Sequence, residues 1–306
     1  MRPAWSVILL TTLIGAAQGL FLVVFLLDAF RAPPQGFVIL SCGVSLLLLV
    51  CGLIASFFHL GRPERAWRAA SQWRTSWLSR EVIVLPAFMG AVAIYGCSVF
   101  FVFDRSISLS IGFVAAVLCM ALFVCTGMIY ACLKFLQEWS SPLTLLNFFL
   151  LGIASGFTLA VPLAVLAYPQ FAGPLALAAF ALGAAAWLAR CAALLRNARL
   201  RPKSTTATAI GVAHPRIVQK AQGFMGGSFN TREFFHGRAE PLVRAVRWTF
   251  LALVFPVPGW LLGWGGGSLA AFAAAFALQF AGLLAERWYF FAEARHPQNL
   301  YYRAMS

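Results

Sequence analysis

Two titratable side chains flank a short polar connection between two long apolar runs. The first run ends at His59, Gly61 and Pro63 break the chain, and the second run opens at Glu81. An imidazole, with a pKa of about 6.5, can take or give a proton at cellular pH, and it could hydrogen-bond a quinone carbonyl. Ionisable groups close to membrane hydrocarbon are costly and often functional. The pair is therefore a candidate site where a hydrophobic redox carrier exchanges protons.

The same two residues have a simpler interpretation. His59 can be an interfacial histidine that reaches toward water, since Gly61 is a plausible helix stop. Glu81 follows Ser79, a good N-cap residue, so its carboxylate would suit the positive end of a helix. From this stretch alone both interpretations stay open.

The connection between the two runs is rich in arginine and tryptophan. Its members are Arg62, Arg65, Arg68, Arg74, Arg80, Trp67, Trp73 and Trp77. Arginines here can hold lipid phosphates or the acidic face of a partner protein, and the tryptophans are typical of a membrane interface. We predict lipid or partner contacts for most of them, Arg65 and Arg68 included. Arg62 or Arg74 could instead stabilise a reduced, anionic quinone headgroup, with Trp77 stacked on its ring.

Composition decides the class of protein. Of 306 residues 61% are apolar and 10% charged, and the mean hydropathy is +0.84. A soluble domain carries about 25% charged residues, so the chain is an integral membrane protein, which we treat as one membrane domain, 1–306. The net charge of +14 resides in loops between apolar runs, which favours a topological signal over nucleic-acid binding. The cysteines lie within apolar runs without a Cys-x-x-Cys pair, which favours helix packing over a disulfide framework or a metal cluster.

Eight apolar runs reach the roughly 20 residues that a helix needs to cross a membrane. They are residues 5–27, 37–58, 82–103, 109–133, 143–167, 172–195, 245–263 and 268–290. The seventh is the least regular, because Pro256 and Pro258 interrupt it. The expected fold is therefore all-α, with eight transmembrane helices.

The positive charges lie almost entirely on one side of this arrangement. With eight spans, both termini share one side with every Lys and Arg except Arg31 and Arg105. The positive-inside rule makes the charged side cytoplasmic. We therefore expect a multi-pass protein of the inner (cytoplasmic) membrane with both termini in the cytoplasm.

The longest connection, residues 196–244 between spans six and seven, is predicted to be a cytoplasmic loop that docks a partner. A disordered linker is poor in aromatic residues, whereas this loop contains GFMGGSFNTREFFHG at 223–237. The candidate docking residues are Phe224, Phe229, Arg232, Phe234 and Phe235. The alternative is a loop that packs only on its own helix ends.

Several kinds of site are not expected. The histidines are 59, 214, 236 and 296, and none lies in the middle of a span, so a bis-histidine haem has no ligands. We predict no metal site and find no nucleotide-binding fingerprint. Glu286 and Arg287 are expected to form an internal ion pair, whereas Asp28 and Asp104 are interpreted as loop-start residues without a role.

The runs ASFFHLGRPERAWRA, SWLSREV and AERWYFF, together with the eight spans, resemble the membrane-anchor subunits of dimethyl sulfoxide reductase-type molybdoenzymes. In that family an HLG signature ends the second span and an S-x-E motif opens the third. The resemblance implies a quinone-binding subunit (ubiquinone or menaquinone) without haem. It maps the quinone-site histidine to His59 and the essential glutamate to Glu81.

The resemblance also implies partners on the cytoplasmic side. They are an iron–sulfur electron-transfer subunit and a molybdopterin catalytic subunit, which hold the clusters and the molybdenum. The long GFMGGSFNTREFFHG loop is similar to the branch that accompanies cytoplasmic quinone-dependent sulfite dehydrogenases. We therefore favour sulfite oxidation with quinone reduction over a dimethyl sulfoxide or polysulfide reductase anchor that oxidises quinol.

Two other classes of function remain as alternatives. A secondary transporter would need polar residues at mid-span. The spans offer little beyond Gln18, Ser45, Thr126, Ser155, Gly156, Thr158 and Gln279. A purely structural anchor would have no quinone site, and binding of a quinone analogue would separate it from the favoured interpretation.

Overall fold

A computed structural model describes residues 1–306 except residues 59, 215, 219–233, 235 and 302–306. In the described part every regular element is helical, and eight helices are long and apolar enough to cross a membrane. The prediction of an all-α fold with eight spans is therefore confirmed.

The long helices follow the predicted runs within a few residues. They are α1 (Trp5–Arg31), α2 (Gln35–Phe57), α3 (Trp77–Phe100), α4 (Arg105–Ala131), α5 (Pro142–Ala167), α6 (Ala172–Ala198), α9 (Glu240–Val254), α10 (Pro256–Trp264) and α11 (Leu269–Glu293). The shorter elements are η1 (Pro63–Gln72), η2 (Pro169–Phe171), α7 (Thr206–Ile210) and η4 (Pro297–Tyr301). The seventh span consists of α9 and α10 in succession. It breaks at Phe255, because Pro256 has no N–H to continue the helical hydrogen bonds.

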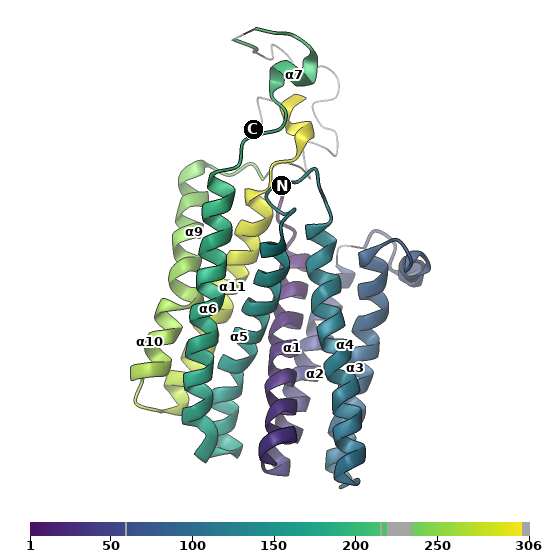
Figure 1. Ribbon diagram of the computed structural model, residues 1–306, viewed down its shortest axis with the longest axis vertical. Coiled ribbons are helices and arrows are strands. Elements are labelled where there is room, and N and C mark those ends of the chain that lie inside the picture. Colours follow the sequence, from purple (N-terminus) through teal and green to yellow (C-terminus); the bar gives the residue numbers. More distant parts are fainter. Residues whose placement is uncertain (59, 215, 219–233, 235, 302–306) are drawn as a thin grey trace.

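The centre of the bundle is formed by α1 and α5, which are the most buried of the spans. Helix α1 packs against α2, α4, α5 and α11 (Figure 1). A polar side chain on the inner face of α1 is therefore surrounded by other helices and kept away from lipid.

Glycines bring α1 and α5 unusually close together. Gly15 and Gly19 on α1 face Gly152 and Gly156 on α5, so each helix contributes a G-x-x-x-G pair. A side chain on Gly156 would overlap the backbone of Gly19. Such pairs let two membrane helices pack backbone against backbone, and this contact sets the spacing of the central helices.

The N-terminus and the last described element, η4, lie at the same end of the bundle, together with η1 and α7 (Figure 1). The Met1 amino group donates a hydrogen bond to the Ala294 carbonyl at 2.7 Å. We call this end the terminal face. An even number of spans accounts for the shared side, while the cytoplasmic identity of the terminal face remains a prediction from charge.

The described parts of the long connection pack on the chain's own C-terminal segment. Helix α7 contacts η4, the Phe234 ring stacks on His296 with centroids 3.8 Å apart, and Asn299 Nδ2 donates to the Phe234 carbonyl at 2.8 Å. The other candidate docking residues of this loop, Phe224, Phe229, Arg232 and Phe235, lie outside the described residues. Partner docking by the loop stays a prediction.

This packing is expected to depend on pH. Burial lowers the pKa of His296 below its ordinary value of 6.5. Folded His296 thus binds a proton less readily than the unfolded segment does, so its packing is stable above pH 6.5 and weakens as the pH falls below that value. Hydrogen exchange of residues 294–301 in the intact protein, corrected for intrinsic rates, should be faster at about pH 5.5 than at about pH 7.5.

A matched variant isolates the contribution of His296. His296→Tyr keeps a ring that can stack but cannot titrate in this range, so its exchange should lose the pH dependence. If the variant retains the full pH dependence, another group is responsible, such as His236, whose pKa burial also lowers.

Candidate functional site

The connection that holds most of the predicted quinone contacts lies exposed at the terminal face. Helix η1 contains no buried residue, and Trp67 and Trp73 are 71% and 52% exposed. Arg62 and Arg74 are exposed as well. His59 lies outside the described residues. The structure therefore presents this connection as a surface element that is open to lipid or to a partner.

Arginine and tryptophan pair along this connection. The guanidinium of Arg68 lies 5.4 Å from the ring centre of Trp67, and that of Arg80 lies 4.2 Å from Trp77. Arg80 also donates to the backbone carbonyl of Trp73 at 2.9 Å. Arg80 thus ties the end of η1 to the start of α3, and cation–π contacts hold the tryptophans at the surface.

Helix α3 begins earlier than the sequence predicted. Its N-cap is Ser76, whose hydroxyl accepts a hydrogen bond from the Ser79 N–H at 3.4 Å, so the assignment of the cap to Ser79 was wrong. With the cap at Ser76, Trp77, Leu78 and Ser79 form the first turn of the helix. Glu81 consequently lies in the second turn and does not occupy the helix end.

Glu81 is buried in the bundle, with 8% of its surface exposed. The Thr126 hydroxyl of α4 donates a hydrogen bond of 2.5 Å to Glu81 Oε1. The simple interpretation of Glu81 as a charge at a helix terminus does not account for this position. A carboxyl group that is enclosed by helices and held by one hydroxyl is suited to accept and release protons.

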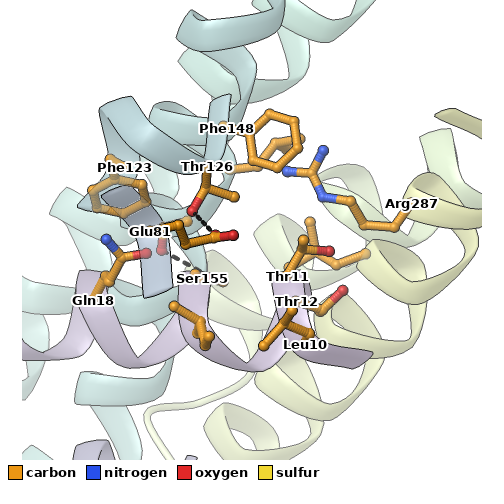
Figure 2. A pocket seen from close by; sticks show the side chains of 15 residues that line it. Leu10, Thr11, Thr12, Gln18, Glu81, Phe123, Thr126, Phe148, Ser155 and Arg287 are labelled. Atoms are coloured by element: carbon orange, nitrogen blue, oxygen red, sulfur yellow. Dashed lines mark hydrogen bonds between the residues drawn. The ribbon is translucent and has the colours of Figure 1, made fainter. Parts of the chain in front are cut away.

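Glu81 faces a small cavity between five helices, lined by both polar and apolar side chains. Figure 2 shows its carboxyl group directed into the space, with Thr126 beside it and Arg287 on the other side. The lining residues include Thr11, Thr12 and Gln18 of α1, Thr126 of α4, Ser155 of α5 and Arg287 of α11. The free volume is about 20 Å³, which suits about one water molecule and is far below the roughly 300 Å³ or more of a ligand pocket.

The predicted site residues therefore do not all meet in one place. Arg62, Arg74 and Trp77 do not line the cavity that contains Glu81. That cavity instead brings together three of the mid-span polar residues, Gln18, Thr126 and Ser155. Their appearance in the middle of apolar runs was the available sequence signal, but spacing along the chain could not show that they surround one carboxylate.

A second polar group lies next to this cavity. Arg190 Nε of α6 is 2.7 Å from Glu286 Oε1 of α11, and Arg287 Nη1 is 3.5 Å from Glu286 Oε2. The predicted Glu286–Arg287 ion pair is thus confirmed. The charge pattern of the sequence groups Arg190 with the positive charges of the loops, but it lies inside α6 and is 3% exposed. The position of Arg190 within the apolar run 172–195 was the sequence signal that could have indicated its burial.

The opposite end of the bundle has its own buried cluster. The Tyr95 hydroxyl donates to Asp28 Oδ2 at 2.6 Å, and Arg105 forms an ion pair with Asp28 at 3.2 Å. Asp28 is not a loop-start residue, because α1 continues to Arg31. The cluster connects α1, α3 and α4 at the end far from the termini.

Comparison with known proteins identifies the family. The family model for the DMSO reductase anchor subunit (DmsC) matches residues 1–217. The chain belongs to this anchor family. The match covers α1 to α6, so Glu81, Thr126 and Arg190 lie within it, whereas Glu286 and Arg287 lie beyond it.

A relative covers the whole length. A sulfite dehydrogenase subunit of Allochromatium vinosum is 52% identical over 330 aligned positions, which include all of both chains. Membership of the anchor family, which the sequence motifs indicated, is therefore confirmed, and the similarity extends through α11.

Proposed function

We propose that this chain is the quinone-binding membrane-anchor subunit of a molybdenum and iron–sulfur oxidoreductase complex of the inner membrane. Family membership supports the role of anchor, and the name of the relative favours sulfite as the partner's substrate. The observation that carries the quinone role is Glu81, a buried carboxyl group beside a water-sized cavity near the terminal face. Ionisable groups at such depth are rarely retained without a function.

The chemistry requires two electrons and two protons. Oxidation of sulfite to sulfate releases two electrons, and reduction of a quinone to a quinol consumes these electrons together with two protons. In our proposal the electrons come from an iron–sulfur cluster of a partner at the terminal face. The anchor chain binds the headgroup and supplies the protons.

We assign a different role to each candidate residue according to where it lies. The cavity next to Glu81 is too small for a quinone ring, so we infer that Glu81 delivers protons from behind the headgroup, by way of water. His59, which follows α2 in the sequence, would donate a hydrogen bond to the headgroup. Arg62 and Arg74 lie at the surface on the partner side, where their charge would favour a reduced headgroup.

The function is tested first at His59. His59→Ala in the assembled complex should reduce sulfite-dependent quinone reduction by about 10²-fold or more, since a general acid–base residue typically contributes that factor. Sulfite oxidation with a soluble dye as electron acceptor should persist, because the dye takes electrons from the partner subunits. The measurement compares the two activities in purified complex.

Gln170→Ala provides the control, because Gln170 is exposed in the connection between α5 and α6, at the end of the bundle far from the termini. It should leave both activities unchanged. Binding of a quinone analogue to wild-type complex separates the rival functions. Absence of analogue binding and of quinone reduction would make the chain a structural anchor and end the proposal.

A further inference from the structure

The cavity next to Glu81 has a neighbour that lies closer to the surface. The second cavity, of about 10 Å³, is lined by Glu138, Arg196 and Asn197 at the terminal face and by Arg190 and Glu286 further in. Phe148 and Arg287 line both cavities. Each space is about the size of one water molecule, and these two residues form a wall that the cavities share.

A series of charged side chains in contact leads from the terminal face to Arg287, which lines both cavities. Glu293 at the end of α11 is 15% exposed, and its carboxylate lies 3.8 Å from Arg190. Arg190 contacts Glu286 at 2.7 Å, and Glu286 contacts Arg287 at 3.5 Å. Glu293 lies two helical turns from Glu286, a distance of about 10 Å. These four contacting side chains therefore connect the partly exposed carboxylate of Glu293 with the cavity that contains Glu81.

Arg287 closes the inner end of this series. Its guanidinium lies over the Phe148 ring at 3.8 Å and is balanced by Glu286. A guanidinium remains protonated under all ordinary conditions, so Arg287 is not itself a proton carrier. Because Arg287 lines both cavities, its N–H groups can orient water in each of them.

Aromatic rings lie in the opposite direction. Phe21 of α1 and Phe88 of α3 are buried and pack edge to face, with ring centres 5.4 Å apart. Phe21 also packs on Tyr95, the partner of Asp28. These rings occupy the helix turns between Glu81 and the Asp28 cluster. Buried charged groups thus lie on the terminal side of Glu81, and packed aromatic rings lie on the other side.

We propose that the protons for quinone reduction reach Glu81 from the terminal face through the second cavity, past Arg287. Glu138 and Glu293 take up protons at the terminal face, where the route begins. Water in the two cavities passes the protons inward. The ion pair between Glu286 and Arg190 keeps the buried part of the route close to neutral. Only protons move along this route, and the electrons arrive separately from the partner. The inference rests on the proposed function, because it names how the same site receives its protons.

The test replaces both carboxylates at the start of the route. The Glu138→Gln/Glu293→Gln double variant is made in the whole complex and assayed for sulfite-dependent quinone reduction and for dye-linked sulfite oxidation. We expect quinone reduction to fall about tenfold or more and dye-linked oxidation to stay at the wild-type rate. Acetate at mildly acidic pH should restore much of the loss, since a small weak acid can carry protons into a blocked route. Asp104→Asn, at an exposed carboxylate at the opposite end of the bundle, should change neither activity.

The outcomes separate the route from the function. Full quinone reduction by the double variant, alongside an inactive Glu81→Gln variant, would refute the route and leave the proposed function standing. Loss of both activities without rescue by acetate would also refute it, since that result indicates structural damage. In vesicles with a pH-sensitive dye on one side, wild-type complex should take up protons from the terminal face, and uptake from the opposite face would overturn the inference. Absence of quinone reduction in the wild type would instead refute the proposed function.

Discussion

Glu81→Gln is expected to lower sulfite-dependent quinone reduction by about 10²–10⁴-fold, the range over which a positioned acid–base group acts. The amide has the shape of the carboxyl group and can still accept the hydrogen bond from Thr126, which measures 2.5 Å in the wild type. It cannot exchange a proton in the relevant range. The variant should therefore fold and assemble while proton delivery stops. The decisive measurement is the ratio of quinone-coupled to dye-linked turnover in purified complex.

Thr126→Val is the companion to this variant. It removes the hydroxyl that holds Glu81 and keeps the side-chain volume, so its effect on quinone reduction should be much smaller than that of Glu81→Gln. Asp28→Asn alters a buried carboxylate at the other end of the bundle and should leave the quinone-coupled rate near that of the wild type. A Glu81→Gln complex with the wild-type ratio of activities would remove Glu81 from the proton path.

Gly156→Leu is expected to cause the largest loss of stability. A side chain at this position meets the backbone of Gly19 and Leu20 on α1 and not a movable side chain. Overpacking a core usually costs about 1–3 kcal/mol and occasionally more, and here two central helices would have to separate. We expect a cost of about 3 kcal/mol or more, seen as a strongly lowered midpoint of thermal unfolding and a low yield of monodisperse protein in detergent.

The control is Gly43→Leu on α2. A Cβ at Gly43 would meet nothing within 4 Å, so the same substitution there should change the unfolding midpoint little. Equal midpoints for Gly156→Leu and Gly43→Leu would show that the contact between α1 and α5 does not support the bundle.

The spans could be predicted because their signal is local. Each of the eight runs is apolar enough to specify a membrane helix wherever it lies in the chain, and the structure contains a helix at each one. The boundaries were less certain, as at Asp28, because a helix can continue past the last apolar residue when another helix satisfies its polar group. Tyr95 and Arg105 do so here.

The candidate site was predicted only in part. Glu81 stands out in the sequence because a carboxylate opens a long apolar run. The residues that share its cavity come from positions far along the chain, such as Thr126 and Arg287. No local pattern relates these residues, since only the packing of α1, α3, α4, α5 and α11 brings them to one cavity. The burial of Arg190 was not predicted for the same reason. Its charge is compensated by Glu286, which lies on a helix distant in the sequence.

The sequence by itself determined that this protein is an eight-span membrane protein with its positive charge concentrated on one side, and its motifs indicated the anchor family. Those properties depend on hydropathy, charge and short motifs, which are independent of how the helices meet. Only the tertiary structure decided that Glu81 turns inward, that the space beside it suits water and not a ring, and that buried ion pairs lead from there to the terminal face. Volumes and contacts between distant helices arise from packing, so they became visible only once the helices were assembled.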